Sequence, residues 1–234
     1  MNFVVIRRAL ALFPLILLLG CLPDRVELKA FKTQGVDHIP TKIGFFTFLS
    51  NAVQGSYGTP YQYYGASEAR ILSATPRIKK TESNVAIVPA TGMDLVITPD
   101  GQMLTDLVTT SLAAKGFSLK QLPVEMQEAK DKEQKASKSF YISLNLLMEL
   151  KEKFGIEAIA LGDAFFTTVM SGTSYRPETR VTMAHIKIVD ITTLDVLAEV
   201  STPYQMDGFN INQTSDALAE SLGELAGISP KQSH

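Results

Sequence analysis

Two stretches decide the fold: residues 156–166, with the sequence IEAIALGDAFF, and residues 180–191, with the sequence RVTMAHIKIVDI. The first stretch is apolar almost throughout, which is typical of a strand buried on both faces of a sheet. In the middle of the second, apolar side chains alternate with polar ones such as His185 and Lys187, and this two-residue period indicates a strand with two different faces. A third strand, at residues 195–201, returns after a tight turn. We expect these strands to form the centre of one sheet.

The remaining elements fit around this sheet. Strand patterns and turn signals place further strands at residues 42–48, 85–88, 95–98 and 117–122, the second and third of which are expected to form a hairpin. Apolar periodicity and turn signals place helices at residues 100–115, 123–138, 140–154 and 213–225. Asp100 can cap the first of these helices, and glycines at positions 116, 155 and 227 end three of them. This order predicts an α/β (α+β) fold, with one mixed sheet of about five to six strands and helices mainly on one face.

The first twenty residues have the pattern of an export signal. Arg7 and Arg8 precede an uncharged apolar run that ends at Gly20 and Cys21. A helix made from this run is about 17 Å long, whereas the hydrocarbon core of a bilayer is about 30 Å thick. A cleaved signal peptide at residues 1–20 therefore fits better than a permanent transmembrane anchor.

The end of this signal, Leu18-Leu19-Gly20-Cys21, resembles the lipobox of bacterial lipoproteins. The resemblance implies that the Cys21 thiol accepts a diacylglyceryl group and that cleavage makes Cys21 the first residue. Two or three acyl chains hold a protein on a bilayer stably, since each buried CH₂ contributes about 0.8 kcal/mol. The alternative, an ordinary secreted protein, would leave a lone thiol in an oxidising compartment. Leu22 stands where an aspartate would favour the inner membrane, so the same resemblance implies the periplasmic side of an outer membrane.

Composition limits the classes of function. The chain has 234 residues, a formal net charge of −2, one cysteine and three histidines. A nearly neutral chain has no broad electrostatic field for nucleic acid. One cysteine forms neither an internal disulfide nor a cysteine-based zinc cage, and three histidines offer little for a metal site. We expect no cofactor except the covalent lipid on Cys21, no metal and no nucleic-acid partner.

Three parts are expected along the chain: the cleaved signal peptide, a lipidated tether at residues 21–40, and a single domain at residues 41–228. The tether is polar, lacks periodicity and ends at Pro40. Within the domain, residues 49–83 form a long insertion rich in tyrosine and glycine, and loops of this length are usually functional or disordered.

This insertion supplies the candidate binding residues. It contains Tyr57, Tyr61, Tyr63 and Tyr64, followed by the basic residues Arg77, Lys79 and Lys80. Tyrosine gives a large contact area with a polar tip, so the four tyrosines could form a contact surface for a partner chain. The insertion could equally fold back and pack its own rings. The sequence leaves both interpretations open.

The two central strands resemble those of a known family. The matching segments are IEAIALGDA at residues 156–164 and MAHIKIVDITTLDVLA at residues 183–198. They are similar to the paired strands of the curli-secretion lipoprotein CsgG and of TolB N-terminal-like domains, and the similarity extends over about residues 100–202 and the strand at residues 42–48. Related lipoproteins serve flagellar and exopolysaccharide-secretion assemblies and form rings by packing side by side. The resemblance therefore implies an outer-membrane lipoprotein that forms homo-oligomers.

The chain departs from this family in two places. Leu194 stands where the family has a turn glycine, and a branched residue at positive φ is costly, so we expect a different turn type. Channel-forming members insert long hairpins that cross the membrane, and each such strand needs about 9 to 11 residues. The corresponding gap, residues 167–179, does not hold two such strands. We therefore expect a periplasm-facing domain without a pore of its own.

No recognised catalytic motif is present in the sequence. The segment from Ser171 to Ser174 lacks the strand and helix context of a nucleophile loop. His185 could be paired with Asp163 or Asp190, but His185 and Asp190 point to opposite faces of a strand and lie about 16 Å apart. We therefore interpret His185 as a surface residue and expect no enzymatic activity.

Three classes of function remain. The leading hypothesis is a non-enzymatic, lipid-anchored assembly or scaffold lipoprotein of an envelope, secretion or flagellar machine. The alternative is a lipoprotein that binds a small ligand or a glycan through the segment from Tyr57 to Tyr64. The third class, an enzyme, requires polar residues that converge in one pocket.

Overall fold

The computed structural model describes residues 26–51, 77–80, 84–88, 95–122, 140–171 and 176–228. The expected signal peptide, Cys21, the tyrosine-rich segment and the charged helix at residues 123–138 lie outside these ranges.

The main sheet has nine strands among the described residues, more than the five to six expected. Its six principal strands lie in the order β1 (Lys29–Lys32), β11 (Val196–Ser201), β10 (Arg176–Asp190), β9 (Ala158–Ser171), β2 (Lys42–Phe45) and β7 (Ser118–Gln121). Three short strands lengthen it, namely β12 (Phe209–Asn210) on β10, β3 (Leu49–Asn51) on β9 and β6 (Leu95–Ile97) on β3. Strands β1, β11, β10 and β9 are antiparallel, whereas β2 is parallel to both β9 and β7. The expected mixed sheet is confirmed, with β9 and β10 at its centre.

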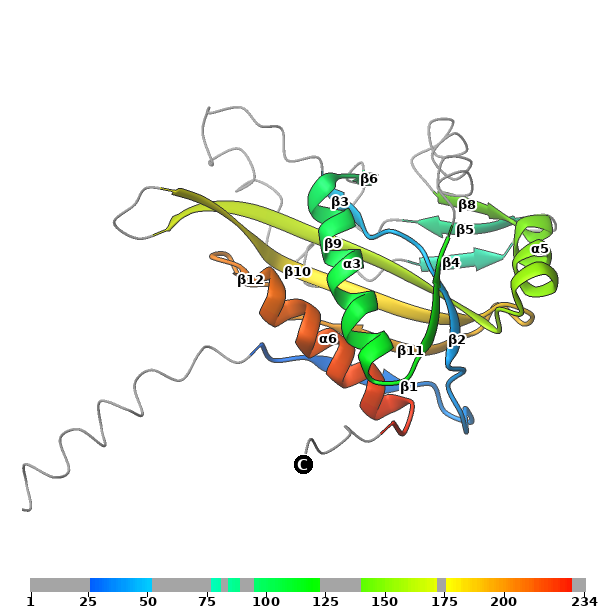
Figure 1. Cartoon of the computed structure of the whole chain (residues 1–234). Helices are drawn as coiled ribbons and strands as arrows, with labels where there is room; N and C mark the ends of the chain where they lie inside the picture. The colour runs from blue at the N-terminus through cyan, green and yellow to red at the C-terminus, as the bar shows by residue number, and fades with distance from the viewer. Residues whose placement is uncertain are drawn as a thin grey trace, which may run out of the picture.

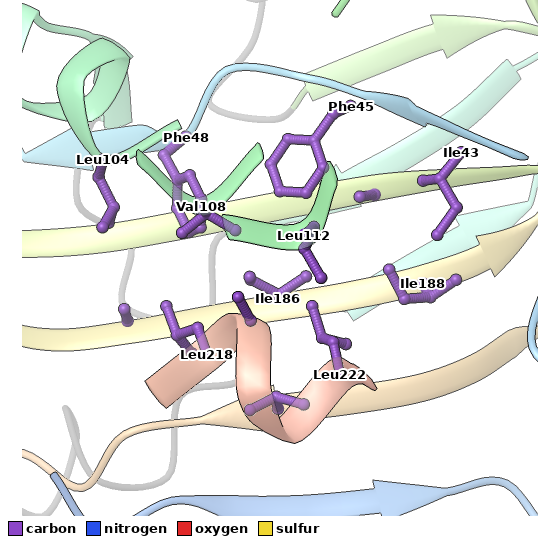
Figure 2. Close-up of a cluster of buried hydrophobic side chains, with 14 of the residues drawn as sticks. Ile43, Phe45, Phe48, Leu104, Val108, Leu112, Ile186, Ile188, Leu218 and Leu222 are labelled. Carbon is purple, nitrogen blue, oxygen red and sulfur yellow. The ribbon is translucent and has the colours of Figure 1, made fainter. Parts of the chain in front are cut away.

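Two helices cover one face of this sheet. Helices α3 (Pro99–Ala114) and α6 (Ile211–Leu225) pack side by side across β9 and β10 (Figure 1). Their apolar stripes meet the side chains that the strands direct to this face. Figure 2 shows this cluster, which includes Ile43, Phe45, Phe48, Leu104, Val108, Leu112, Ile186, Ile188, Leu218 and Leu222. The amphipathic pattern of both helices therefore predicted their position correctly.

The opposite face holds a second apolar cluster. Helix α5 (Leu144–Phe154) contributes Leu147 and Leu150, which pack with Ile159 and Leu161 of β9. Because side chains alternate along a strand, odd-numbered residues of β9 point to this face and even-numbered residues point to α3 and α6. Both faces of β9 are therefore buried from Ala158 to Phe166, the part whose apolar sequence predicts it.

The helix ends follow from local chemistry. Thr98 caps α3, since its Oγ1 accepts a hydrogen bond from the Gly101 amide at 3.1 Å. Asp100 was expected in this role but lies in the first turn, where a negative charge suits the helix dipole. Gly116, Gly155 and Gly227 all have positive φ just after the three helices, which confirms the expected ends.

One expected hairpin is wrong. Residues 85–88 and 95–98 were expected to pair with each other, but they belong to different sheets. Strand β5 (Asn84–Val88) lies between β4 (Arg77–Lys80) and β8 (Phe140–Ser143), whereas β6 pairs with β3. The segment at residues 77–80 is thus a strand, although it was expected within a loop. Likewise, the helix expected from residue 140 begins only at Leu144, because residues 140–143 pair with β5.

The expected tether also contains ordered structure. Lys29–Lys32 pairs with β11 along its whole length, while Val26 and Ile39 are buried. The folded body therefore begins much closer to Cys21 than the composition of this segment indicated.

Candidate functional site

The sequence-predicted site residues are not placed by the structure. Cys21, Tyr57, Tyr61, Tyr63 and Tyr64 all lie outside the described residues. Lipidation of Cys21 and partner binding by the tyrosines therefore stay predictions. The described residues instead bring together two features that the sequence did not reveal: a buried polar strip and a projecting hairpin.

The polar strip crosses three neighbouring strands on the face opposite to α3 and α6. It consists of Asp163 on β9, His185 and Lys187 on β10, and Glu199 and Ser201 on β11. Each of the five is at most 8% exposed. Burying this many polar groups is costly unless they satisfy one another, so their contacts decide what the strip does.

Two ion-pairing contacts join the strip across the strands. His185 Nδ1 lies 3.1 Å from Asp163 Oδ2, and Lys187 Nζ lies 3.3 Å from Glu199 Oε2. In both pairs the two residues are directly opposite in the strand register. The interpretation of His185 as a surface residue is therefore wrong. The alternation of the sequence showed that His185 shares a face with Lys187, but it could not show that this face is covered.

One carboxylate oxygen on each side of the strip has no hydrogen-bond partner among the described residues. These atoms are Asp163 Oδ1 and Glu199 Oε1, and both are buried. A half-satisfied polar network in a low-dielectric interior is more sensitive to substitution than an apolar one.

One row of the polar strip, which crosses the three strands, contains an aspartate, a histidine and a serine, the residue types of a nucleophilic triad. Asp163, His185 and Ser201 are neighbours in register across β9, β10 and β11. The described residues do not contain a hydrogen bond between His185 and Ser201, and Ser201 is 8% exposed. The row also lies within a continuous β-ladder, whose amides are engaged with neighbouring strands rather than converging on a substrate oxygen. Its geometry is that of a packed cross-strand network.

The projecting hairpin is formed by the far ends of β9 and β10. On its outer sides, β3 pairs with β9 only to Ala164, and β12 pairs with β10 only from Arg180. Beyond these points β9 and β10 continue to pair with each other to Ser171 and Arg176, and no other described strand pairs with them there. Figure 1 shows this ribbon extending past α3 and α6 at the left. The sequence placed the strand ends at residues 166 and 180, so the hairpin was missed.

Polar contacts brace the base of the hairpin, and its outer part is exposed. Glu178 pairs with Arg180 at 3.2 Å and accepts a hydrogen bond from Asn210 Nδ2 at 3.3 Å. Further out, Met170 is 64% exposed and lies opposite Pro177 in the register. This apolar side chain therefore lies largely in solvent.

Among the described strands, the sheet ends at β1 on one side and at β7 on the other. Within the described part of the chain, β1 pairs only with β11, and β7 pairs only with β2. All residues of β1 are exposed, among them Phe31 at 53%. Lysines at both ends of β1 are typical of edge strands that resist uncontrolled pairing.

Two kinds of feature are not found among the described residues: a membrane-spanning helix and a metal-binding cluster. None of the helices in these ranges is both long enough and apolar enough to span a bilayer. These ranges also contain no group of three or more histidine, cysteine, aspartate or glutamate side chains that could hold a metal ion.

Comparisons with known proteins reach only solved structures. No protein-family model matches the chain, and no curated protein matches its sequence. The chain is similar to the dodecamer of a PelC variant from Paraburkholderia phytofirmans, at 12% identity and a TM-score of 0.41, over 86% of this chain and 99% of that one. A second PelC dodecamer from the same organism gives 11% identity and a TM-score of 0.41, over 86% and 98% of the two chains. A DUF4136 family protein from Bacteroides thetaiotaomicron gives 7% identity and a TM-score of 0.38, over 87% and 98%. At these values the likeness carries no conclusion about function.

Proposed function

We propose that this chain is a non-enzymatic, lipid-anchored assembly protein that acts on the periplasmic side of an outer membrane. It scaffolds an envelope, secretion or flagellar machine, forms homo-oligomers and has no pore of its own. Its membrane attachment is the lipid on Cys21, and it takes no other cofactor.

One observation carries this proposal: the folded body begins directly behind the lipobox-like sequence. Val26 is buried at 7% exposure and is five residues from Cys21. Because an extended chain spans at most about 3.6 Å per residue, Val26 lies within about 18 Å of the lipidated residue. A body held this close to a bilayer has its surfaces available to neighbours on the same membrane rather than to distant partners.

The two outermost strands of the described sheet, β1 and β7, support oligomerisation. Strands β1 and β7 lie at opposite ends of the principal strand order, so the two edges differ from each other. Contact between β1 of one copy and the β7 side of the next would be heterologous, and such contacts form rings when the rotation closes. Attachment to one membrane favours closure of the ring, because it holds all copies in the same orientation and at the same height above the bilayer.

The oligomer is tested by extracting the lipidated protein in mild detergent and measuring its mass by native mass spectrometry. We expect a discrete multimer. Phe31→Glu, which places a charge on the β1 edge, should weaken assembly about tenfold or more, since a charge buried in an interface is costly. Met148→Glu is the control, because Met148 is 59% exposed and lies on α5 rather than on either edge strand. A strictly monomeric wild type, or equal effects of the two variants, would contradict the proposal.

A further inference from the structure

We propose that β1 of one copy and β7 of the next copy pair as antiparallel strands, and that Phe31 packs there against the Lys120 ammonium group, which lies over the ring of Phe154. This inference rests on the proposed homo-oligomer and names the contact that forms it. The partner is a second copy of this chain, which completes a cation–π site at the junction.

The two edge strands run in opposite directions. Strands β1, β11, β10 and β9 alternate in direction, and β2 and β7 both run parallel to β9. Strand β7 therefore runs opposite to β1. Copies that the proposed lipid holds on one membrane share one orientation, so β7 of the next copy also runs opposite to β1 of the first. The sheet can then continue from one copy into the next through an antiparallel pair.

The backbone groups of β1 are directed suitably for this pair. The Thr33 amide donates to the Leu197 carbonyl of β11 at 3.0 Å. Because the direction of these groups alternates along a strand, the amides and carbonyls of Ala30 and Lys32 point away from β11. All four residues of β1 are exposed.

The same alternation holds in β7. The amides of Ser118 and Leu122 donate to carbonyls at positions 41 and 45, on the β2 side. The amides and carbonyls of Leu119 and Gln121 therefore point away from β2. An antiparallel ladder between the copies pairs these groups with those of residues 30 and 32, so only registers that differ by two residues are possible.

Charge selects one of these registers. If Phe31 lies opposite Ser118, Lys29 lies opposite Lys120, and like charges directly opposite each other are destabilising. If Phe31 lies opposite Lys120, the two lysines are separated. A shift by two residues in the other direction moves Phe31 past the end of β7 at Gln121. Phe31 is therefore assigned to Lys120.

This register brings an aromatic ring to a cation that already lies over another ring. Lys120 Nζ is 3.1 Å from the centroid of the Phe154 ring in α5, on the face opposite to α3 and α6. Phe31 lies on the same face, since it is opposite Glu199 in the register, and its side chain is 53% exposed. Attraction between a cation and a ring strengthens as water is excluded, so enclosure of Lys120 between the two rings stabilises the junction.

Disulfide crosslinking of the full lipidated chain tests the register. The sequence contains one cysteine, Cys21, and acylation blocks that thiol. Phe31→Cys and Lys120→Cys are combined in one chain, extracted in mild detergent and oxidised. Directly opposite residues that are not hydrogen-bonded have Cα atoms about 4.5 Å apart, within the range of a disulfide. We expect a ladder of covalent multimers on a non-reducing gel.

The matched control combines Phe31→Cys with Ser118→Cys. In the assigned register this pair is diagonal, with Cα atoms about 7–8 Å apart, and should give at least about fivefold less multimer. Equal ladders from the two pairs overturn the register. Covalent dimers from Phe31→Cys alone overturn the pairing itself, because they would show that β1 meets β1.

A double-mutant cycle tests the contact without cysteines. Phe31→Leu and Lys120→Met are measured singly and together, and their effects on the Kd of assembly should be non-additive by about threefold to fivefold, as expected for a cation–π contact. Additive effects overturn the contact. A glutamate at position 31 would face Lys120, but an ion pair removed from water gives little net gain over an apolar contact, so Phe31→Glu still weakens assembly.

Native mass spectrometry of the wild type separates failure of this inference from failure of the proposed function. If the lipidated wild type is strictly monomeric, the proposed oligomer fails, and the inference fails with it. If a discrete multimer is present but the 31–120 pair gives no ladder and the cycle shows no coupling, the oligomer stands and only the β1–β7 pairing is wrong.

Discussion

Leu194 holds a conformation that a branched side chain seldom adopts. Its φ is +65°, in the turn between β10 and β11, and its side chain is 7% exposed within the cluster around α5. Asp190 organises the turn, because its Oδ1 accepts hydrogen bonds from the amides of Thr192 and Thr193, both at 2.7 Å. We expected a different turn type because a leucine at positive φ is strained. That expectation was wrong, since burial of the Leu194 side chain offsets the strain.

This balance gives the first prediction. Leu194→Ala should lower the free energy of unfolding by about 2–4 kcal/mol, because a buried leucine is lost and the strain remains. Leu194→Gly loses the same contacts but relieves the left-handed strain, so it should be about 1 kcal/mol more stable than the alanine variant. Urea denaturation of the two variants checks the order. An alanine variant more stable than the glycine variant would show that the turn relaxes.

The polar strip gives the second prediction. Removing one partner of a buried ion pair leaves an uncompensated charge, so Lys187→Met should cost about 3–5 kcal/mol of stability. Adding Glu199→Leu removes that charge and should restore most of the loss, since an apolar pair of similar volume packs in the same place. The double-mutant cycle is measured by denaturant unfolding, and additive losses would mean that Lys187 and Glu199 do not interact.

At the scale of elements, α3 is fitted closely to the irregular segment between β2 and β3. The amide of Phe48 donates to Thr105 Oγ1 at 2.9 Å, and Thr105 Oγ1 donates to the Gly101 carbonyl at 2.7 Å. A Cβ on Gly101 would lie 2.5 Å from the Phe48 carbonyl oxygen, and one on Gly162 would lie 2.6 Å from the Phe48 ring. Gly101 and Gly162 therefore allow α3 and β9 to pack closely against the buried Phe48.

Thr105→Val tests this arrangement. Valine keeps the volume but leaves the buried Phe48 amide without its acceptor, so stability should fall by about 1–3 kcal/mol. Thr110→Val is the control, because the Thr110 hydroxyl donates to the Asp106 carbonyl of its own helix at 2.7 Å, and its loss should cost less than about 1 kcal/mol. Thermal or urea unfolding of both variants distinguishes them. Equal losses would show that the bond to Phe48 is not what stabilises the contact.

Local patterns predicted single elements well and their partners less well. The periodicity of side chains and of residues a few positions apart predicts the apolar faces of α3 and α6, the glycines that end the helices, and the central strands. The partner of residues 85–88 depends instead on residues 140–143, which lie far away in the chain and form a strand only where that pairing is available. The pairing of His185 with Asp163 needed the register of β9 against β10, which alternation alone does not set.

At the scale of the whole molecule, β1 and β10 run in the same direction, so both strands start towards the same end of the sheet. Strand β1 brings the N-terminal chain into the sheet beside β11, and the long central strands carry the hairpin in the direction from which that chain arrives. Among the described strands, β1 and β7 lie at the two sides of the same sheet.

The account depends on the body being fastened to a bilayer through Cys21, and a fractionation experiment tests that most directly. Wild-type protein and Cys21→Ser are expressed in the same cells, the envelopes are separated by flotation, and the intact masses are measured. We expect wild type to float with the envelopes, to begin at Cys21 and to carry the mass of two or three acyl chains, whereas Cys21→Ser should lack that mass and leave the membrane fraction. A serine variant that still floats and is processed like wild type would contradict the account.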